Sequence, residues 1–329
     1  MIDEEERLKL SLGGLLYAPA VNRKIPGKIR EGAIPDLRSV AFCLEDAIDD
    51  GFLEEAEMSL GDTLSDLAKL PEKLPSIFIR IRSPRHMERI AELYKEHGRI
   101  VTGFILPKFD LSNMDEYIGL IRDLNKGDES KTVYIMPILE SRMVADIGTR
   151  VGTLMKIKEA LDTVRKYVLN VRVGGNDFCN LYGLRRSESQ TIYDIGVVRD
   201  ILVCIINIFA ADYVVSGPVW EYFGTDEEYG WRTGLSRELE LDRLNGFIGK
   251  TAIHPSQLPL IHESMKVNRS DYEDAMRILD WDVQGLGVAK SESGNRMNEV
   301  KVHGKWARRV YLLSEIYGIR ETNQGYDRF

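Results

Sequence analysis

Eight short apolar runs alternate along this chain with longer charged stretches, and this alternation constrains the fold more than any other feature. Stretches such as 52–70 and 113–126 place their apolar residues at the spacing of a helix. Eight strand–helix units of about thirty residues each are typical of a (β/α)8 barrel, which has about 250 residues. The 329-residue chain therefore predicts an α/β fold, a TIM barrel with an additional segment. The expected strands are 14–18, 39–44, 76–81, 101–106, 133–139, 167–173, 211–215 and 249–253.

The chain continues past the eighth run with two helical patterns, at 271–279 and 305–317. The segment between them, 283–302, contains Gly and Ser and predicts a flap or hairpin. We therefore expect a TIM-barrel catalytic domain at 1–265 and a C-terminal extension of helices and flap at 266–329.

Composition excludes several classes of protein. The chain has 44 basic and 52 acidic residues and lacks the basic stripe that binds nucleic acid. No apolar run approaches the ~20 residues of a membrane span, and the first residues are acidic where a secretory signal would be basic. Cys43, Cys179 and Cys204 are too widely spaced to indicate a zinc site or a disulfide framework. We expect a cytoplasmic protein without nucleic-acid or membrane partners.

Polar residues follow most of the apolar runs, at the positions where a TIM barrel builds its active site. Each has an ordinary explanation, because a carboxylate can cap the next helix and a basic side chain can extend into solvent at the rim. Their recurrence at one predicted rim instead favours an active site. These residues are Glu45, Asp46, Arg80, Lys108, Glu140, Gly174, Gly175, Asn176, Asp177 and His254.

Seven motifs in the same regions resemble those of a known enzyme family. In chain order they read LYAPAVNR, FCLEDAIDD, IFIRIRSP, GFILPKFD, MPILES, VGGNDF and GKTAIHPSQ. Over residues 15–279 the chain resembles the citrate lyase beta-subunit and malyl-CoA lyase group, the HpcH/HpaI aldolase-type carbon–carbon lyases of the pyruvate/phosphoenolpyruvate-binding barrels. The resemblance implies a Mg²⁺-dependent lyase that cleaves or forms a bond next to a 2-oxo acid through a metal-stabilised enolate.

The resemblance also implies a role for each strand-end residue. Glu140 and Asp177 match the metal ligands, which agrees with the preference of Mg²⁺ for one or two protein carboxylates. They are 37 residues apart, about one strand–helix unit, so they should lie on neighbouring strand ends. Arg80 matches a catalytic, substrate-binding arginine. Substrate contacts are further expected at Gly174, Gly175 and Asn176, and supporting roles around the site at Glu45, Asp46, Lys108 and His254.

One further catalytic residue is expected in the C-terminal segment. The stretch GNRMNEVKVH resembles a flap whose acidic residue reaches the active site of a neighbouring subunit and acts as acid or base. In this chain the acidic residue is Glu299, two positions after Met297. By composition alone Glu299 reads as a solvated loop charge. The family reading implies a homo-oligomer, a trimer or a multiple of one.

Two departures from the family motifs bear on the substrate. The chain reads Gly-Gly-Asn-Asp where relatives read Gly-Ala-Glu-Asp, and Pro-Ala-Val-Asn-Arg where relatives read Pro-Gly-Asn-Arg. The inserted residue makes a CoA thioester doubtful, so the expected partner is a small 2-oxo or hydroxy acid. Two alternatives stay open. One is a non-catalytic or weakly active binding subunit of a larger complex. The other is an enolate-using isomerase or phosphotransferase, although no Gly-rich phosphate loop followed by Lys-Ser/Thr is present.

Overall fold

The structure, a computed structural model, describes residues 4–70, 74–93, 95–126, 131–224, 230–281, 287–290 and 296–321. The chain divides into two compact units, one of Leu12–Ile261 and one that combines Met1–Ser11 with His262–Phe329. The division into functional domains at 1–265 and 266–329 stays a prediction.

The larger unit contains eight parallel strands, hydrogen-bonded in the order β7-β6-β5-β4-β3-β2-β1-β8. The Gly217 N–H donates to Gly249 O (3.0 Å) and the Ile248 N–H to Val215 O (2.8 Å), so the two outermost strands also meet. The sheet therefore nearly closes, and the predicted TIM barrel is confirmed. The strands are β1 Gly14–Pro19, β2 Ser39–Cys43, β3 Ser76–Arg80, β4 Val101–Leu106, β5 Tyr134–Leu139, β6 Val171–Val173, β7 Val215–Ser216 and β8 Lys250–Ala252.

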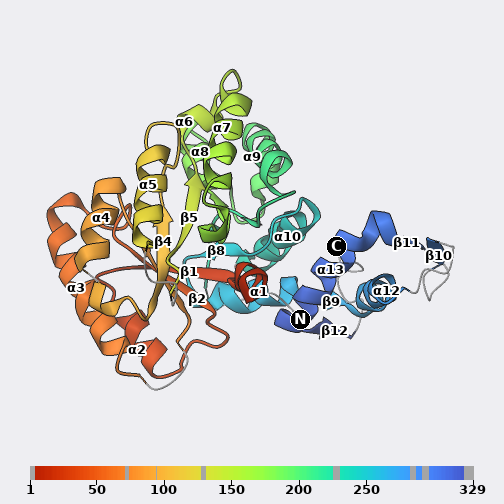
Figure 1. The fold of residues 1–329 in the computed structure, drawn as a ribbon, viewed down its shortest axis with the longest axis horizontal. Helices are drawn as coiled ribbons and strands as arrows, with labels where there is room; N and C mark the ends of the chain where they lie inside the picture. Colours follow the sequence, from red (N-terminus) through yellow and green to blue (C-terminus); the bar gives the residue numbers. More distant parts are fainter. Residues whose placement is uncertain are drawn as a thin grey trace. The chain divides into compact units, whose positions relative to one another are not determined.

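Helices surround the strands (Figure 1). Their sequences are amphipathic: α3 buries Leu60, Leu64 and Leu67, which recur at helical spacing, and its first turn carries Glu54 and Glu55, which favour a helix N-terminus. The helices of this unit are α2 Lys24–Arg30, α3 Leu53–Leu67, α4 Pro84–Leu93, α5 Met114–Leu124, α6 Arg142–Ala145, α7 Arg150–Asp162, α8 Gly175–Leu181, α9 Gly196–Phe209 and α10 Trp231–Leu244, and α11 Leu258–Met265 follows.

Each strand divides its side chains between the helices and the barrel interior. On β3, Ile77 and Ile79 belong to the hydrophobic core shared with the helices, whereas Phe78 and Arg80 alternate with them and face inward. The same alternation on β6 places Val171 and Val173 against the helices and turns Arg172 to the interior. Inward-facing side chains are the ones that can contribute to a site at the barrel mouth.

The sixth strand is shorter than predicted. Residues Arg165–Tyr167 form a 3₁₀ helix, and the pairing of β5 with β6 shifts by one residue between the Ile135–Val168 bridge and the Ile138–Arg172 pair. Pro137 lies between these pairs on β5 and has no N–H to donate, so a local irregularity is expected there.

The seventh strand also differs from its predicted range, 211–215. The structure forms β7 over Val215–Ser216, because the chain before it continues the turn that ends α9. The N–H groups of Asp212 and Tyr213 both donate to Phe209 O, and these bonds exclude them from the sheet.

The smaller unit contains the two predicted C-terminal helices, α12 Arg269–Leu279 and α13 Val300–Tyr317, together with α1 Glu4–Ser11. Strands β10 Val288–Lys290 and β11 Met297–Glu299 form an antiparallel hairpin within the predicted flap. Residues 283–286 and 291–295 of that flap lie outside the described residues. A short parallel pair, β9 Val267–Asn268 and β12 Ile319–Arg320, completes the unit.

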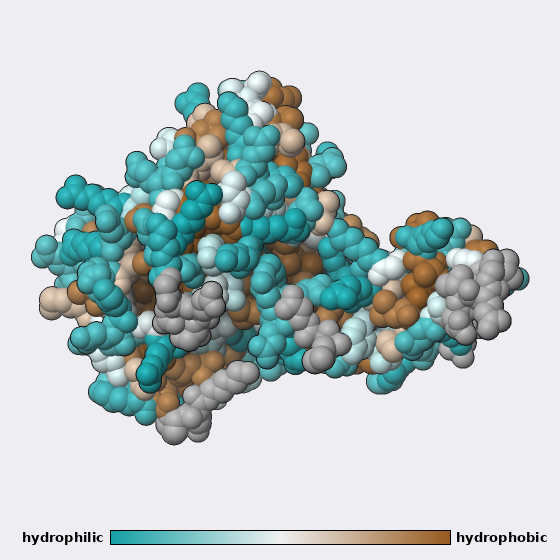
Figure 2. Space-filling model, in the orientation of Figure 1, coloured by the Kyte–Doolittle hydropathy of each residue, from teal (hydrophilic) through white to brown (hydrophobic). Residues whose placement is uncertain are grey.

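The surface of the molecule is mainly hydrophilic on the face shown in Figure 2, with scattered hydrophobic residues between. Over the residues that the structure describes, none of the helices has the length and apolar character needed to cross a bilayer.

Candidate active site

The predicted site residues of the barrel lie at the carboxyl ends of the parallel strands. Glu45 and Asp46 follow β2, Arg80 ends β3, and Glu140 follows β5 directly. Gly174 follows β6, and α8 starts at the next residue, so Asn176 and Asp177 belong to its first turn. Because all eight strands are parallel, these residues share one end of the barrel.

Arg80 is the centre of a cluster of carboxylates. Its Nη2 lies 2.7 Å from Glu45 Oε2, 3.0 Å from Asp46 Oδ2 and 3.7 Å from Glu140 Oε1. Its Nη1 lies 3.9 Å from Cys43 Sγ. Arg80, Glu45 and Glu140 are buried, so these ion pairs act in a medium of low polarity, where the attraction between charges is stronger than in water.

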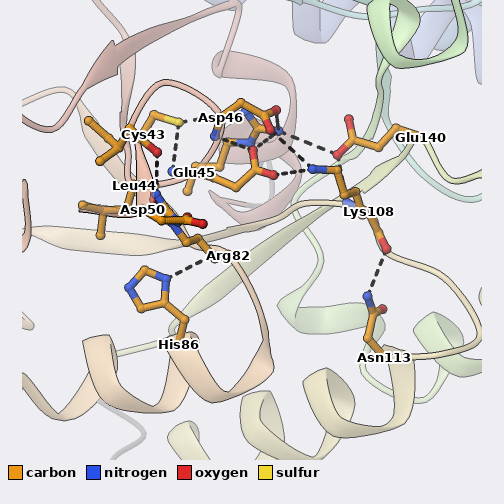
Figure 3. Close-up of polar contacts among 12 residues, drawn as sticks. Cys43, Leu44, Glu45, Asp46, Asp50, Arg82, His86, Lys108, Asn113 and Glu140 are labelled. Carbon is orange, nitrogen blue, oxygen red and sulfur yellow. Dashed lines mark hydrogen bonds and ion pairs between the residues drawn. The ribbon is translucent and has the colours of Figure 1, made fainter. Parts of the chain in front are cut away.

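Lys108 joins the same cluster through both its side chain and its backbone (Figure 3). Its Nζ donates to Glu45 Oε1 (2.7 Å) and Asp46 Oδ1 (3.3 Å), and its backbone N–H donates to Glu140 Oε1 (2.8 Å). The backbone bond depends on an unusual conformation, because Lys108 has a φ of 49°, in the left-handed region that non-glycine residues rarely adopt. Asn113 holds this turn by donating to Lys108 O (3.0 Å).

The loop that carries Glu45 and Asp46 is held by Arg82, a residue that the sequence did not indicate. The Arg82 guanidinium donates to Leu44 O and Ile48 O, both at 2.6 Å, and pairs with Asp50. These bonds fix the backbone on either side of the two carboxylates (Figure 3). Arg82 follows β3 within the motif IFIRIRSP, and from this position it holds the loop after β2 in place.

Glu140 is buried with 5% of its surface exposed, and burial raises the pKa of its carboxyl to about 8. The charge of Asp177 adds to the rise, while Arg80 and the Lys108 N–H oppose it. Two carboxylates this close in a buried place favour a cation between them, because a cation relieves their mutual repulsion.

Gly174 lets the Glu140 side chain lie against the backbone beside Asp177. A Cβ added at Gly174 would lie 2.2 Å from Glu140 Oε2, 2.4 Å from Glu140 Cβ and 3.1 Å from Asp177 Oδ2. Any side chain at this position would therefore displace Glu140 from its place beside Asp177. Gly175 has a different reason to be glycine, since its Cβ would lie 2.7 Å from Pro218 in a buried contact.

Asn176 and His254 lie at the same end of the barrel with different surroundings. The side-chain oxygen of Asn176 is buried and has no hydrogen-bond partner among the described residues. His254 caps a 3₁₀ helix, with Nδ1 accepting from the Ser256 N–H (3.2 Å), and its ring stacks on Phe223 at 4.6 Å between centroids. Burial lowers the pKa of His254, and the charge of Lys28 adds to this.

Glu299 belongs to the smaller unit, where it is the residue before α13. Its backbone N–H donates to His303 Nδ1 (2.9 Å). Its side chain is partly exposed and forms no hydrogen bond or ion pair within the described part of the chain. Its predicted role in the site of a neighbouring subunit stays a prediction.

Two inward-facing residues close to the site were not indicated by the sequence motifs. Tyr17 on β1 lies beside Arg80, whose Cζ is 5.8 Å from the Tyr17 ring centroid. Arg172 on β6 donates from Nη2 to Thr251 Oγ1 on β8 (2.6 Å). The alternation of side chains along GLLYAP and VRV could have indicated both residues, because it predicts which side chains point inward once the strands are assigned.

The chain matches a known protein family over most of its length. Residues 6–319 match the family described as C-C bond lyase of the TIM-barrel fold. The chain belongs to this carbon–carbon bond lyase family. The family consists of enzymes, so the predicted class of enzyme is confirmed. No curated protein sequence matches the chain.

Solved structures similar to this lyase include CitE from Mycobacterium tuberculosis in complex with magnesium, acetoacetate and coenzyme A. The likeness has a TM-score of 0.62 at 18% identity and covers 93% of this chain and 99% of that one. The citrate lyase beta subunit of M. tuberculosis with oxaloacetate and magnesium gives 0.53 at 20%, covering 78% and 98%. RipC from Yersinia pestis gives 0.53 at 16%, covering 78% and 95%. At such identities these likenesses establish the fold, and with the family match they confirm the resemblance to citrate lyase beta-subunit-like lyases.

Proposed function

We propose that this lyase depends on Mg²⁺ and cleaves or forms a carbon–carbon bond next to a small 2-oxo acid. The observation that carries the proposal is the pair Glu140 and Asp177, whose carboxylates lie together beside Gly174. Magnesium complexes of the similar citrate lyase beta subunit with oxaloacetate, and of CitE with acetoacetate and pyruvate, support the same cofactor and substrate class.

The residues present fit a magnesium ion. Mg²⁺ prefers oxygen ligands and is usually held by one or two carboxylates, with the remaining positions left to water and substrate. Glu140 and Asp177 supply two carboxylates, and the absence of a side chain at Gly174 lets them lie side by side. Among the described residues no group of three or more His, Cys, Asp and Glu side chains is placed to hold a metal, so the candidate site relies on this pair.

Held by Glu140 and Asp177, Mg²⁺ would supply Lewis-acid chemistry toward the carboxylate and keto oxygens of the acid. Arg80 binds an oxygen of the same acid with its remaining guanidinium N–H groups, since its Nε has no hydrogen-bond partner among the described residues. Glu45, Asp46 and Lys108 hold Arg80 and Glu140 in position. Gly174 lets the substrate approach the backbone closely.

Glu299 is the proposed acid or base of the reaction, supplied by a neighbouring subunit of a homo-oligomer. The support is its sequence position in the predicted flap and a carboxylate that the described residues of its own chain leave without an ion pair. A group that exchanges protons with the substrate must be able to reach it. A carboxylate without an ion pair in its own chain loses little interaction energy when it moves toward the substrate.

Coenzyme A stays a doubtful substrate carrier for this chain, although one similar CitE structure contains it. Arg23, the arginine of the first motif, pairs with Asp62 on α3 at 2.9 Å. The ground for proposing a free acid as substrate remains the residue inserted before Arg23 in the first motif.

A thermal-shift and calorimetry panel of 2-oxo and 2-hydroxy acids, with and without Mg²⁺, tests the proposal. We expect at least one acid to stabilise the protein only when Mg²⁺ is present, because metal and acid bind together. The matched variant Arg80→Lys keeps the charge but loses the planar fork, and should weaken acid binding more than Mg²⁺ binding. Binding of Mg²⁺ without turnover of any acid would instead favour a binding subunit.

A further inference from the structure

The Arg172 guanidinium is a buried charge with few partners. Arg172 is 2% exposed, its Nη2 donates to Thr251 Oγ1, and it also interacts with the Tyr17 hydroxyl. Its Nε and Nη1 are buried and have no hydrogen-bond partner, and none of the described carboxylates forms an ion pair with it. A buried cation without a counter-ion is costly, so its presence requires a reason.

Another buried arginine in the same barrel shows what a structural arginine looks like here. Arg150, 6% exposed, donates from Nε to Val144 O (3.1 Å) and from Nη2 to Ala145 O (2.8 Å), and pairs through Nη1 with Asp200 (2.5 Å). All three nitrogens are used. The contrast with Arg172 indicates that the Arg172 nitrogens serve a partner that is not part of the folded chain.

Arg172 lies one layer beneath the proposed metal site. It pairs with Ile138 on β5, and Glu140 and Gly174 come two residues later on the two strands. Two residues along a strand span about 7 Å, a distance that the long side chain of arginine covers. Arg172 therefore lies within reach of a small molecule bound at the level of Glu140.

Tyr17 connects Arg172 with the same region. Burial raises the pKa of Tyr17, and the charges of Arg172 and Arg80 oppose that rise, so both guanidinium groups lie near its hydroxyl. Glu140 also acts on Tyr17. Tyr17 is partly exposed, whereas Arg172 is buried.

Arg80 alone cannot satisfy an acid with two negative groups. Its Nη2 is already shared among the carboxylates of Glu45, Asp46 and Glu140. A second anionic group on the substrate needs a second cation, and Arg172 is the buried cation nearby that lacks an acidic partner among the described residues.

We propose that Arg172 and Tyr17 form a second anion subsite, which binds a carboxylate at the end of the substrate away from the metal. Arg172 is then a specificity-determining residue that selects 2-oxo or 2-hydroxy dicarboxylic acids over the matching monocarboxylic acids. The inference rests on the proposed function for the position of the metal-binding end of the acid.

Two probes that differ in one group test the subsite. Malate and 2-hydroxybutyrate share a 2-hydroxy acid end, and malate carries a carboxylate where the other acid has a methyl group. By titration calorimetry with Mg²⁺, we expect wild-type protein to bind malate at least about tenfold more tightly, as a charge-assisted hydrogen bond in a buried site predicts. Equal affinities for the two acids in wild-type protein would overturn the inference, whatever the variants do.

The variant Arg172→Met removes the charge and keeps much of the volume. We expect it to lose the preference for malate while binding 2-hydroxybutyrate and Mg²⁺ as wild type does. Tyr17→Phe, which keeps the ring beside Arg80, should reduce the preference by a smaller factor. A preference for malate that persists at full size in both variants would contradict the assignment.

Stability of the ligand-free protein separates a binding role from a structural one. Arg172→Met should melt at the same temperature as wild type or higher, because it removes a buried charge without an acidic partner. The control Arg150→Met should melt lower, since it removes three satisfied bonds. A large loss of melting temperature in Arg172→Met would mark Arg172 as structural and overturn the inference.

The same titrations without Mg²⁺ separate the subsite from the proposed function. If Mg²⁺ plays no part, malate affinity will be unchanged by the metal, yet the preference over 2-hydroxybutyrate and its loss in Arg172→Met will remain. If the subsite is wrong and the metal site is right, both acids will bind more tightly with Mg²⁺ and to the same extent.

Discussion

The backbone N–H of Lys108 donates a 2.8 Å hydrogen bond to Glu140 Oε1, across the ends of two neighbouring strands. This bond fixes one carboxylate oxygen and leaves Oε2 as the oxygen that lies beside Gly174. The orientation of the proposed metal ligand therefore depends on the left-handed backbone of Lys108, whose φ is 49°.

Substitutions at Lys108 should separate its backbone role from its charge. Lys108→Gly keeps the N–H and suits the positive φ, so we expect Mg²⁺ affinity within about threefold of wild type. Lys108→Val places a β-branched residue at a positive φ and should cost about 1–3 kcal/mol of stability and lower Mg²⁺ affinity more than Lys108→Gly does. Calorimetry and chemical denaturation measure both. A loss of Mg²⁺ affinity in Lys108→Gly as large as in Lys108→Val would show that the side chain matters instead.

Gly174→Ala should abolish Mg²⁺ binding. Its methyl group would lie 2.2 Å from Glu140 Oε2, closer than any real contact, so the carboxylate must move away from Asp177. Overpacking of this kind costs about 1–3 kcal/mol. The control is Gly119→Ala on α5, where a Cβ meets nothing within 4 Å and helix propensity predicts a gain of about 0.5–1 kcal/mol. Wild-type Mg²⁺ affinity in Gly174→Ala would refute the role given to Gly174.

Most residues of the barrel rim could be predicted from the sequence, because a parallel barrel brings all carboxyl ends of its strands together. Glu140 and Asp177 could be assigned to neighbouring ends from their spacing alone. The bounds of β6 could not, since Pro137 on the partner strand shifts the pairing and the effect depends on which strands meet.

Other features of the candidate site could not be predicted from the sequence, for physical reasons. The left-handed turn at Lys108 could not be predicted, because a lysine in the sequence does not indicate a positive φ. The hydrogen bonds of Arg82 to the loop after β2 join residues that are distant in the sequence. Arg172 was within reach of sequence reasoning, because a charge in the middle of a buried strand requires a partner. The placement of Glu299 depends on an assembly that one chain does not determine.

Glu299→Gln should lower turnover strongly while Mg²⁺ and acid binding stay at wild-type strength, because the residue is proposed to move protons only. If the site is shared between subunits, two inactive variants can complement each other. Mixed oligomers of Glu299→Gln and Glu140→Gln should recover up to about a quarter of wild-type turnover, the fraction of sites that combine two intact residues. No recovery in verified mixed oligomers, or full activity of a demonstrable monomer, would exclude a shared site.

We expect the stability of the fold to depend on pH through His86, which accepts a hydrogen bond from the backbone of Arg82. The Arg82 N–H donates to His86 Nδ1 (3.1 Å), and Nε2 faces Glu57 Oε1 (3.2 Å), so the ring is neutral with its proton on Nε2. Burial lowers the pKa of His86 to about 4, and the charges of Arg82 and Arg89 add to this.

An unfolded histidine binds its proton at about pH 6.5, whereas folded His86 does so at about pH 4, so the unfolded state holds more protons between these values. The contribution of His86 to stability is therefore fully present above pH 6.5 and is lost as the pH falls toward 4. In His86→Gln, urea denaturation should show a smaller loss of stability between pH 7 and 5 than in wild type. Parallel curves for the two proteins would show that His86 does not titrate in this way.

The central claim is that Glu140 and Asp177 together hold the metal, and anomalous diffraction from crystals grown with Mn²⁺ in place of Mg²⁺ tests it most directly. We predict one strong peak beside Glu140 and Asp177, about 2.1 Å from an oxygen of each carboxylate, and its loss in Glu140→Gln crystals grown in the same way. A peak elsewhere in the barrel, or an equal peak in Glu140→Gln, would contradict the account.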